Sequence, residues 1–257
     1  MASKLAPLFD LTGRTAIVTG GNSGIGTAMA HALGMAGSRV ILVARRIAEL
    51  EAAAENLSHD GIAVTTIPAD LAATDAHKKI ESIVRSKSLT PDIIVNAAGI
   101  NLRRPFAEVS ADEFDLHTAL HLRAPFLLTQ MFAPAMASRG WGRIINIASM
   151  QSWRAFPDSA PYGAAKGGVI QLTRAIAEEW SRHGVTCNAI APGFFPTPLT
   201  DAVFKDPERV NRLAAQTAIG RNGHLSDLVG VTVFLASKAS DYITGQTLAV
   251  DGGFSAK

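Results

Sequence analysis

The chain has 257 residues and a formal net charge of +2; 47% of its residues are hydrophobic and only 18% are charged. This length suits one large α/β domain, and the weak charge excludes the clustered basic surface that binds nucleic acid. No run approaches the roughly 18 apolar residues of a membrane span, and the N-terminal residues carry no apolar signal segment. Because Cys187 is the only cysteine, no intrachain disulfide forms, and we expect a cytoplasmic protein without nucleic-acid or membrane partners.

Strand-like apolar runs alternate along the chain with helical patterns. Helices are expected near 24–37, 47–57, 110–138 and 159–183, where apolar residues recur at helical spacing. Strands are expected at 14–20, 38–45, 62–70, 91–99, 142–149, 184–193 and 246–253. Strands that are apolar throughout indicate a parallel sheet covered on both faces. Right-handed crossovers then give an α/β, doubly wound Rossmann fold with a seven-stranded parallel sheet.

The whole chain, 1–257, is predicted to be a single domain, because no linker or internal repeat interrupts it. The longest irregular stretch is 193–222, which carries three prolines. A long insertion after a strand is more often a functional lid than a plain connector. We therefore expect 193–222 to cover a substrate.

A glycine-rich turn, TGGNSGIG at 19–26, stands between the first strand and the first helix. Its glycines let the backbone approach a pyrophosphate, which the free N–H groups of a helix N-terminus then bind. Ordinary turns also use glycine, and the spacing G-x-x-x-G-x-G departs from the usual fingerprint, but the place between strand and helix favours a dinucleotide site. The expected contacts are Gly20, Asn22, Ser23, Gly24, Ile25 and Gly26.

Four ordered motifs, TGGNSGIG, NAAG at 96–99, Ser149 and YGAAK at 162–166, together resemble those of the single-domain short-chain dehydrogenase/reductase family. The resemblance covers nearly the whole chain, from about Leu11 to Gly253. The opening LFDLTGRTAIVTGG and SMQS at 149–152 are similar to the branch of gluconate 5-dehydrogenase and 2-deoxy-gluconate 3-dehydrogenase. The resemblance implies an NAD(P)-dependent enzyme that acts on CH–OH groups and assembles as a homotetramer, although dimers occur in the family.

The end of the second strand faces the adenosine ribose, where a carboxylate repels a 2′-phosphate. Ala44 stands at the family's acidic position and Arg45 follows it, which favours NADP(H). Ser23, where many NADP-preferring relatives have a basic residue, argues the other way, and NAD(H) remains possible. The family's other dinucleotide contacts match Asp70 and Leu71 at the adenine, Asn96, Ala97 and Gly99 in the cleft, Tyr162 and Lys166 at the ribose, and Pro192, Gly193 and Thr197 at the nicotinamide.

Tyr162 and Lys166 are four residues apart and share one face of a helix. A free phenol titrates near ~10 and is a poor base at neutral pH, and we expect the Lys166 ammonium to favour the phenolate. Tyr162 is then the general acid/base at the substrate oxygen, and Ser149 stabilises the charge on that oxygen. An isolated Tyr-x-x-x-Lys pair is weak evidence of a catalytic site. The presence of Ser149 and of the glycine turn upstream makes the evidence much more specific.

His121 departs from the family pattern, which has an asparagine at this place in the helix before the fifth strand. In the family the asparagine is thought to hold a water of a proton relay behind the lysine. We expect His121 to hold that water and to titrate near neutral pH. The alternative is that His121 only fills the helix interior.

Arg103 and Arg104 come shortly after the fourth strand, and paired arginines at a pocket mouth suit a carboxylate. The predicted substrate is a small polar hydroxy or keto acid, such as a sugar acid, bound by Arg103, Arg104, Gln151, Trp153 and Phe195. Solvated surface arginines explain the pair equally well. The competing activity is 3-oxoacyl-carrier-protein reduction, and a non-catalytic NADP(H)-binding sensor or scaffold is the alternative of another class. No metal site is predicted.

Overall fold

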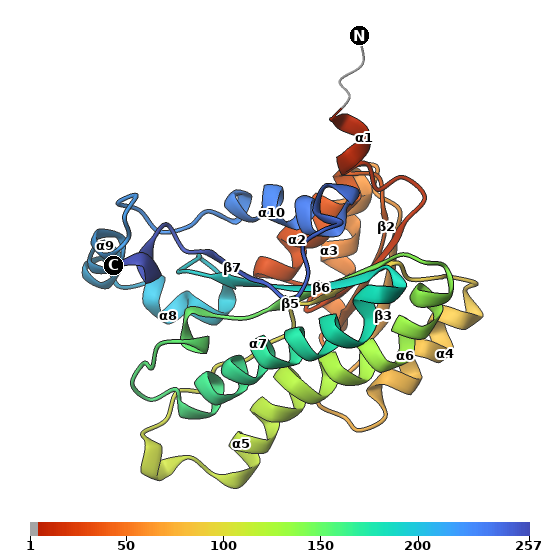
Figure 1. Ribbon diagram of the computed structural model, residues 1–257. Coiled ribbons are helices and arrows are strands. Elements are labelled where there is room, and N and C mark those ends of the chain that lie inside the picture. Colours follow the sequence, from red (N-terminus) through yellow and green to blue (C-terminus); the bar gives the residue numbers. More distant parts are fainter. Residues whose placement is uncertain (1–4) are drawn as a thin grey trace.

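A seven-stranded parallel sheet runs through the computed structural model, which describes residues 5–257 (Figure 1). All neighbouring strands are parallel. Each strand falls inside one of the seven predicted ranges, so the doubly wound fold is confirmed. The strands are β1 (Thr15–Thr19), β2 (Arg39–Ala44), β3 (Val64–Pro68), β4 (Ile93–Asn96), β5 (Gly142–Ile147), β6 (Val185–Pro192) and β7 (Thr247–Val250).

The strand order is β3-β2-β1-β4-β5-β6-β7, so the winding reverses between β1 and β4. In such sheets ligands bind in the crevice at the carboxyl ends of the strands, beside the reversal. Thr19 pairs in register with Asn96, and Asn96 with Asn146. The carboxyl ends of β1, β4 and β5 therefore meet at one edge of the sheet, and this edge carries the candidate site.

Helices cover both faces of the sheet, with α2, α3 and α10 above it and α4, α6 and α7 below it in Figure 1. A continuous apolar core lies under each group of helices. The helices are α1 (Ala6–Phe9), α2 (Gly24–Met35), α3 (Ile47–His59), α4 (Ala76–Ser86), α5 (Ala111–Thr118), α6 (Ala124–Ser138), α7 (Ala160–Trp180), α8 (Asp201–Phe204), α9 (Pro207–Gln216) and α10 (Val229–Ala236). Short 3-10 helices cover Phe106–Glu108, Met150–Ser152, Ser181–His183, Pro198–Thr200, Leu225–Leu228, Lys238–Ser240 and Phe254–Ala256.

α5 and α6 form one long helix with a π-helical turn, Ala119–Arg123, between them. A capping box starts the helix: the Ser110 hydroxyl accepts from the Glu113 N–H at 3.2 Å, and the Glu113 carboxylate accepts from the Ser110 N–H at 3.0 Å. A π-helical turn inserts an extra residue and is frequent at functional sites. Here it contains His121, which is buried.

The stretch 193–222 is largely helical, so the prediction of irregular structure from its prolines was wrong. It contains α8 and α9, and Pro207 lies in the first turn of α9. Proline is tolerated there because the first N–H groups of a helix have no intrahelical partner. The Asp206 side chain accepts from the Arg209 N–H at 3.1 Å and caps the helix.

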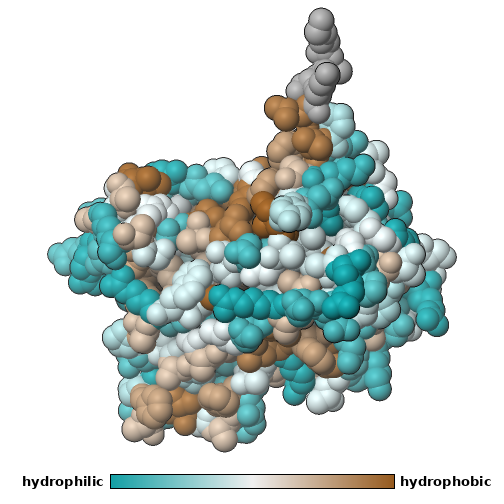
Figure 2. Space-filling model, in the orientation of Figure 1, coloured by the Kyte–Doolittle hydropathy of each residue, from teal (hydrophilic) through white to brown (hydrophobic). Residues whose placement is uncertain are grey.

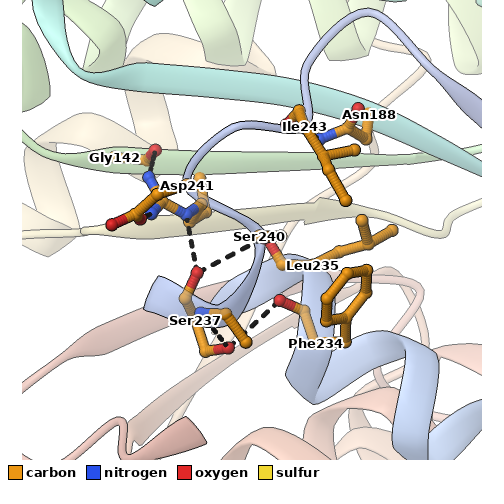
Figure 3. A network of polar contacts seen from close by, with 10 residues as sticks. Gly142, Asn188, Phe234, Leu235, Ser237, Ser240, Asp241 and Ile243 are labelled. Carbon is orange, nitrogen blue, oxygen red and sulfur yellow. Dashed lines mark hydrogen bonds and ion pairs between the residues drawn. The ribbon is translucent and has the colours of Figure 1, made fainter. Parts of the chain in front are cut away.

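Arg143 connects the turn after α10 to the amino end of β5, opposite the candidate site. Figure 3 shows this turn, with Ser237, Ser240 and Asp241 close to Gly142. The Arg143 side chain is only 2% exposed. It donates to the Ser237 carbonyl at 3.2 Å, to the Gly142 carbonyl at 2.9 Å and to the Asp241 carboxylate. Every one of these acceptors lies at the amino edge of the sheet or in the turn beside it, so this network stabilises the scaffold.

In the described part of the chain, residues 5–257, no helix has the length and apolar character needed to cross a bilayer. Apolar side chains do reach the surface, at α1 and at the end of the molecule that carries α5 (Figure 2). Phe106, just before α5, is 82% exposed, and Trp153, in the loop after β5, is 53% exposed.

Candidate active site

The glycine turn between β1 and α2 is shaped by backbone crowding. A Cβ on Gly26 would lie 2.1 Å from the carbonyl oxygen of Gly20, and one on Gly20 would lie 2.8 Å from the Ala98 backbone. Gly20 also has φ +67°, which favours glycine. Ser23 is the N-cap of α2 and its side chain makes no capping bond. The first-turn N–H groups are therefore available to an anion, and this arrangement fits the pyrophosphate of a dinucleotide.

Thr19 connects the ends of β1 and β4 beside this turn, and the sequence analysis missed it. Its Oγ1 accepts from the N–H groups of Ala97 and Ala98 at 3.1 and 3.2 Å. The start of the 193–222 segment also reaches the turn, since a Cβ on Gly24 would lie 3.1 Å from the side chain of Thr197. The structure thus brings together the predicted contacts Gly20, Gly24, Ala97 and Thr197.

The predicted adenosine end of the site is open to solvent. Ala44 at the end of β2 is buried, whereas the Arg45 side chain is 68% exposed. Arg45 Nη1 lies 3.9 Å from a carboxylate oxygen of Asp70, whose other oxygen accepts from the Ala72 N–H at 3.0 Å. A pair this long and this exposed holds the arginine weakly. Its guanidinium is free to turn toward a phosphate.

Tyr162 and Lys166 lie on the same face of α7 and are both buried, as their spacing predicts. The Lys166 Nζ is 5.6 Å from the centre of the Tyr162 ring and donates to the carbonyl of Ile147 in β5. Ser149, just after β5, accepts from the Gln151 N–H at 3.1 Å through its hydroxyl. The three side chains therefore meet at the carboxyl edge of the sheet.

The electrostatics of this group differ from the expectation that Lys166 lowers the pKa of Tyr162. Burial raises the pKa of Tyr162, and a hydrogen bond with Ser149 and the positive charge of Arg103 act in the opposite direction. Burial lowers the pKa of Lys166 to about 7, so a large fraction of this amine is neutral at pH 7. The cation that favours the Tyr162 phenolate in this structure is Arg103.

The two predicted arginines, Arg103 and Arg104, interact with different partners. Arg104 Nε donates to a carboxylate oxygen of Glu113 at 3.0 Å, so its charge is already paired. Arg103 is exposed at the surface. Partial desolvation nevertheless lowers its pKa, and the charges of Arg209, Asp158 and Tyr162 act on it. Of the two, Arg103 is the one whose charge acts on Tyr162.

The other predicted substrate residues are divided between a cavity and the core. A cavity of about 430 Å³ beside the first turns of α7 is lined by Gln151, Trp153 and Arg104, among others. Phe195 is 2% exposed and packs in the apolar core of the α2 and α10 face. Its burial argues against the substrate contact predicted for it.

Comparisons with known proteins agree with this geometry. A family model described as enoyl-(acyl carrier protein) reductase matches residues 20–255. Gluconate 5-dehydrogenase of Gluconobacter oxydans (strain 621H) is 39% identical over 248 residues, which cover 96% of each chain. The chain belongs to the short-chain dehydrogenase/reductase family.

Other relatives of this short-chain dehydrogenase/reductase point to similar chemistry. The 2-dehydro-3-deoxy-D-gluconate 5-dehydrogenase of Escherichia coli (strain K12) is 36% identical over 250 residues, 97% of this chain and 98% of that protein. Among solved structures, a gluconate 5-dehydrogenase from Burkholderia cenocepacia J2315 in complex with NADP and tartrate has a TM-score of 0.93 and 36% identity, covering 98% and 99% of the two chains. A 3-oxoacyl (acyl-carrier-protein) reductase from Agrobacterium tumefaciens C58 with NADP bound has a TM-score of 0.92 and 28% identity over 98% of each chain.

His121 occupies the helix interior behind Tyr162, and the prediction that it titrates near neutral pH was wrong. Burial holds its pKa well below the ordinary value, and the charge of Lys166 acts in the same direction. Its Nε2 lies 2.9 Å from the carbonyl oxygen of Ile100 and donates to it. Among residues 5–257, its Nδ1 has no hydrogen-bond partner. The structure therefore places a neutral imidazole behind Tyr162.

Proposed function

We propose that the protein is an NADP(H)-dependent oxidoreductase that interconverts a secondary alcohol and a ketone on a small, carboxylate-bearing substrate resembling a sugar acid. The observation that carries this proposal is the meeting of Ser149, Tyr162 and Lys166 at the carboxyl edge of the sheet, beside a glycine turn whose first-turn amides are uncapped. Membership of the short-chain dehydrogenase/reductase family supports the reaction class.

The cofactor preference rests on Ala44 and Arg45. No carboxylate ends β2, and the exposed Arg45 guanidinium suits a 2′-phosphate. The solved relatives with NADP bound support the same preference. When bound, the dinucleotide supplies or accepts a hydride at the substrate carbon.

The side chains of the protein manage the proton and the charge on the substrate oxygen. In the reducing direction Tyr162 donates its phenolic proton to that oxygen, and in the oxidising direction it takes the proton back. Ser149 donates a hydrogen bond to the same oxygen and stabilises its charge. Lys166 binds the nicotinamide ribose, and the unpartnered Nδ1 of His121 accepts from a relay water behind it.

Arg103 selects the substrate class in this proposal. Its charge acts on Tyr162, whereas Arg104 is paired with Glu113. A guanidinium in this place suits a carboxylate on the substrate. The tartrate in the solved Burkholderia relative is a dicarboxylate and supports the idea.

The proposal is tested by NADPH oxidation with 5-keto-D-gluconate, with an acetoacetyl thioester and with the neutral ketose L-tagatose. We expect turnover of the keto acid, and an Arg103→Ala variant with a raised KM for the keto acid only. Turnover of the thioester alone would favour 3-oxoacyl-carrier-protein reduction. Tight NADPH binding without turnover of any keto acid would favour a sensor or scaffold.

We further propose that the protein is a cytoplasmic homotetramer in which 193–222, with α8 and α9, covers the substrate. Exposed apolar side chains such as Phe106, Phe114 and Phe126, which are 82%, 48% and 47% exposed, support an assembly through the α5 and α6 face. Light scattering measures the assembly directly, and a monomer would contradict it.

A further inference from the structure

Two buried histidines lie against the segment 99–104, which joins β4 to the turn before α5. His117 is in the last turn of α5 and His121 is four residues later; their exposed fractions are 0% and 2%. The two rings stack, with centres 6.0 Å apart and 29° between their planes. His121 then meets the Tyr162 ring edge-to-face at 5.3 Å. The three rings form a row that ends at the candidate catalytic phenol.

The hydrogen bonds of His117 fix its tautomer. Its Nδ1 lies 2.7 Å from the carbonyl oxygen of Glu113, so Nδ1 carries the proton and donates it. Its Nε2 is then the acceptor for the Leu102 N–H at 3.3 Å. A neutral imidazole offers one donor and one acceptor, and both are used. Leu102 lies in a segment without helix or strand, so its N–H has no ladder or helical partner and is bound by the His117 side chain instead.

The same segment is fixed at two other places. His121 Nε2 donates to the Ile100 carbonyl at 2.9 Å, and the Arg104 N–H donates to the Asp158 carbonyl at 3.0 Å. Arg103 therefore stands between Leu102, whose N–H is bound by His117, and Arg104, whose N–H is bound by the Asp158 carbonyl. Its backbone therefore cannot move without breaking one of these bonds.

We propose that His117 is a positioning residue that sets the preference for anionic substrates, because its bond to the Leu102 amide holds Arg103 beside Tyr162. This inference rests on the proposed contact between Arg103 and the substrate carboxylate. The hydrogen bond itself is open to test without any substrate, so the two proposals fail separately.

Two conservative variants distinguish the hydrogen bond of Nε2 from that of Nδ1 in the His117 ring. The amide of His117→Gln reaches the place of Nε2 and keeps an acceptor for the Leu102 N–H. The amide of His117→Asn reaches the place of Nδ1 and keeps only the bond to the Glu113 carbonyl. The variants have the same polarity and differ in the bond that matters here.

Hydrogen–deuterium exchange of peptides that cover 99–105 tests the bond. We expect the Leu102 amide to be protected in the wild type and in His117→Gln, and to exchange at least tenfold faster in His117→Asn. Fast exchange of this amide in the wild type, or equal loss in both variants, would overturn the proposal. The wild-type rate decides the point even if His117→Asn does not fold.

Steady-state kinetics with NADPH and 5-keto-D-gluconate test the effect on the substrate. We expect His117→Asn to raise KM about five- to tenfold, as for the loss of one ordinary hydrogen bond, with His117→Gln near the wild type and KM for NADPH unchanged in both. In an Arg103→Ala background His117→Asn should have no further effect on KM. Additive effects would refute the role in positioning Arg103. If the wild type does not turn over the acid, the proposed function fails, and the exchange experiment still judges the role of His117.

Discussion

Replacing Lys166 by Met should change how the stability of the cofactor-free protein depends on pH. The amine is buried, and burial lowers its pKa from 10.5 to about 7. Below pH 7 both the folded and the unfolded chain carry the proton, so the full cost of burying an ammonium is present. Above pH 7 the folded protein loses this proton while the unfolded chain keeps it until near pH 10.5. The free energy of unfolding contributed by Lys166 therefore rises with pH across this window.

The size of the effect follows from the pKa and from the one bond that Lys166 makes. The slope approaches about 1.4 kcal/mol for each pH unit. The bond to the Ile147 carbonyl offsets part of the cost of burial. Between pH 6 and pH 9 we therefore expect the free energy of unfolding of the wild type to rise by about 2–3 kcal/mol relative to Lys166→Met.

Urea denaturation of both proteins at several pH values and one protein concentration measures this difference. Titrations elsewhere cancel in the comparison. Lys205→Met, at a side chain that is 76% exposed, is the matched control and should follow the wild type. Parallel profiles for the wild type and Lys166→Met would refute the reasoning, since they would show that the ammonium is not desolvated.

Three further substitutions test the phosphate contact, the glycine turn and the far edge of the sheet. Arg45→Ala should raise KM for NADPH about ten- to a hundredfold, the value of one charge-assisted hydrogen bond, and leave KM for NADH unchanged; equal losses would contradict the 2′-phosphate contact. Gly26→Ala should abolish the rise in Tm that NADPH causes, because its Cβ would lie 2.1 Å from the Gly20 carbonyl oxygen; a retained rise would refute the tight turn. Arg143→Ala should lower the free energy of unfolding by about 3 kcal/mol and leave the Kd for NADPH unchanged, and a weakened Kd would show that the far edge is coupled to the site.

The fold was predictable because the strands of a parallel sheet are buried on both faces. Ile93, Ile94 and Val95 form such an unbroken apolar run, and all three are fully buried. The stretch 193–222 was mispredicted because proline was taken as a breaker. At Pro207 it begins a helix, and the Asp206 cap confirms the start.

The motif positions were predictable, but their charge states were not. Sequence spacing places Lys166 beside Tyr162, whereas its pKa depends on how deeply the folded chain buries the amine. The pairing of Arg104 with Glu113 likewise depends on where the turn before α5 lies. No sequence motif pointed to His117, because its role depends on a hydrogen bond with Leu102, which lies in a segment without helix or strand.

The most direct test of the central claim removes only the phenolic oxygen of Tyr162. Tyr242→Phe is the matched control, because Tyr242 is the only other tyrosine and is fully exposed. If Tyr162 is the general acid/base, single-turnover oxidation of NADPH by a keto-acid substrate should fall at least a hundredfold in Tyr162→Phe, with the Kd for NADPH within about twofold of the wild type. A Tyr162→Phe variant that oxidises NADPH as fast as Tyr242→Phe would contradict the account.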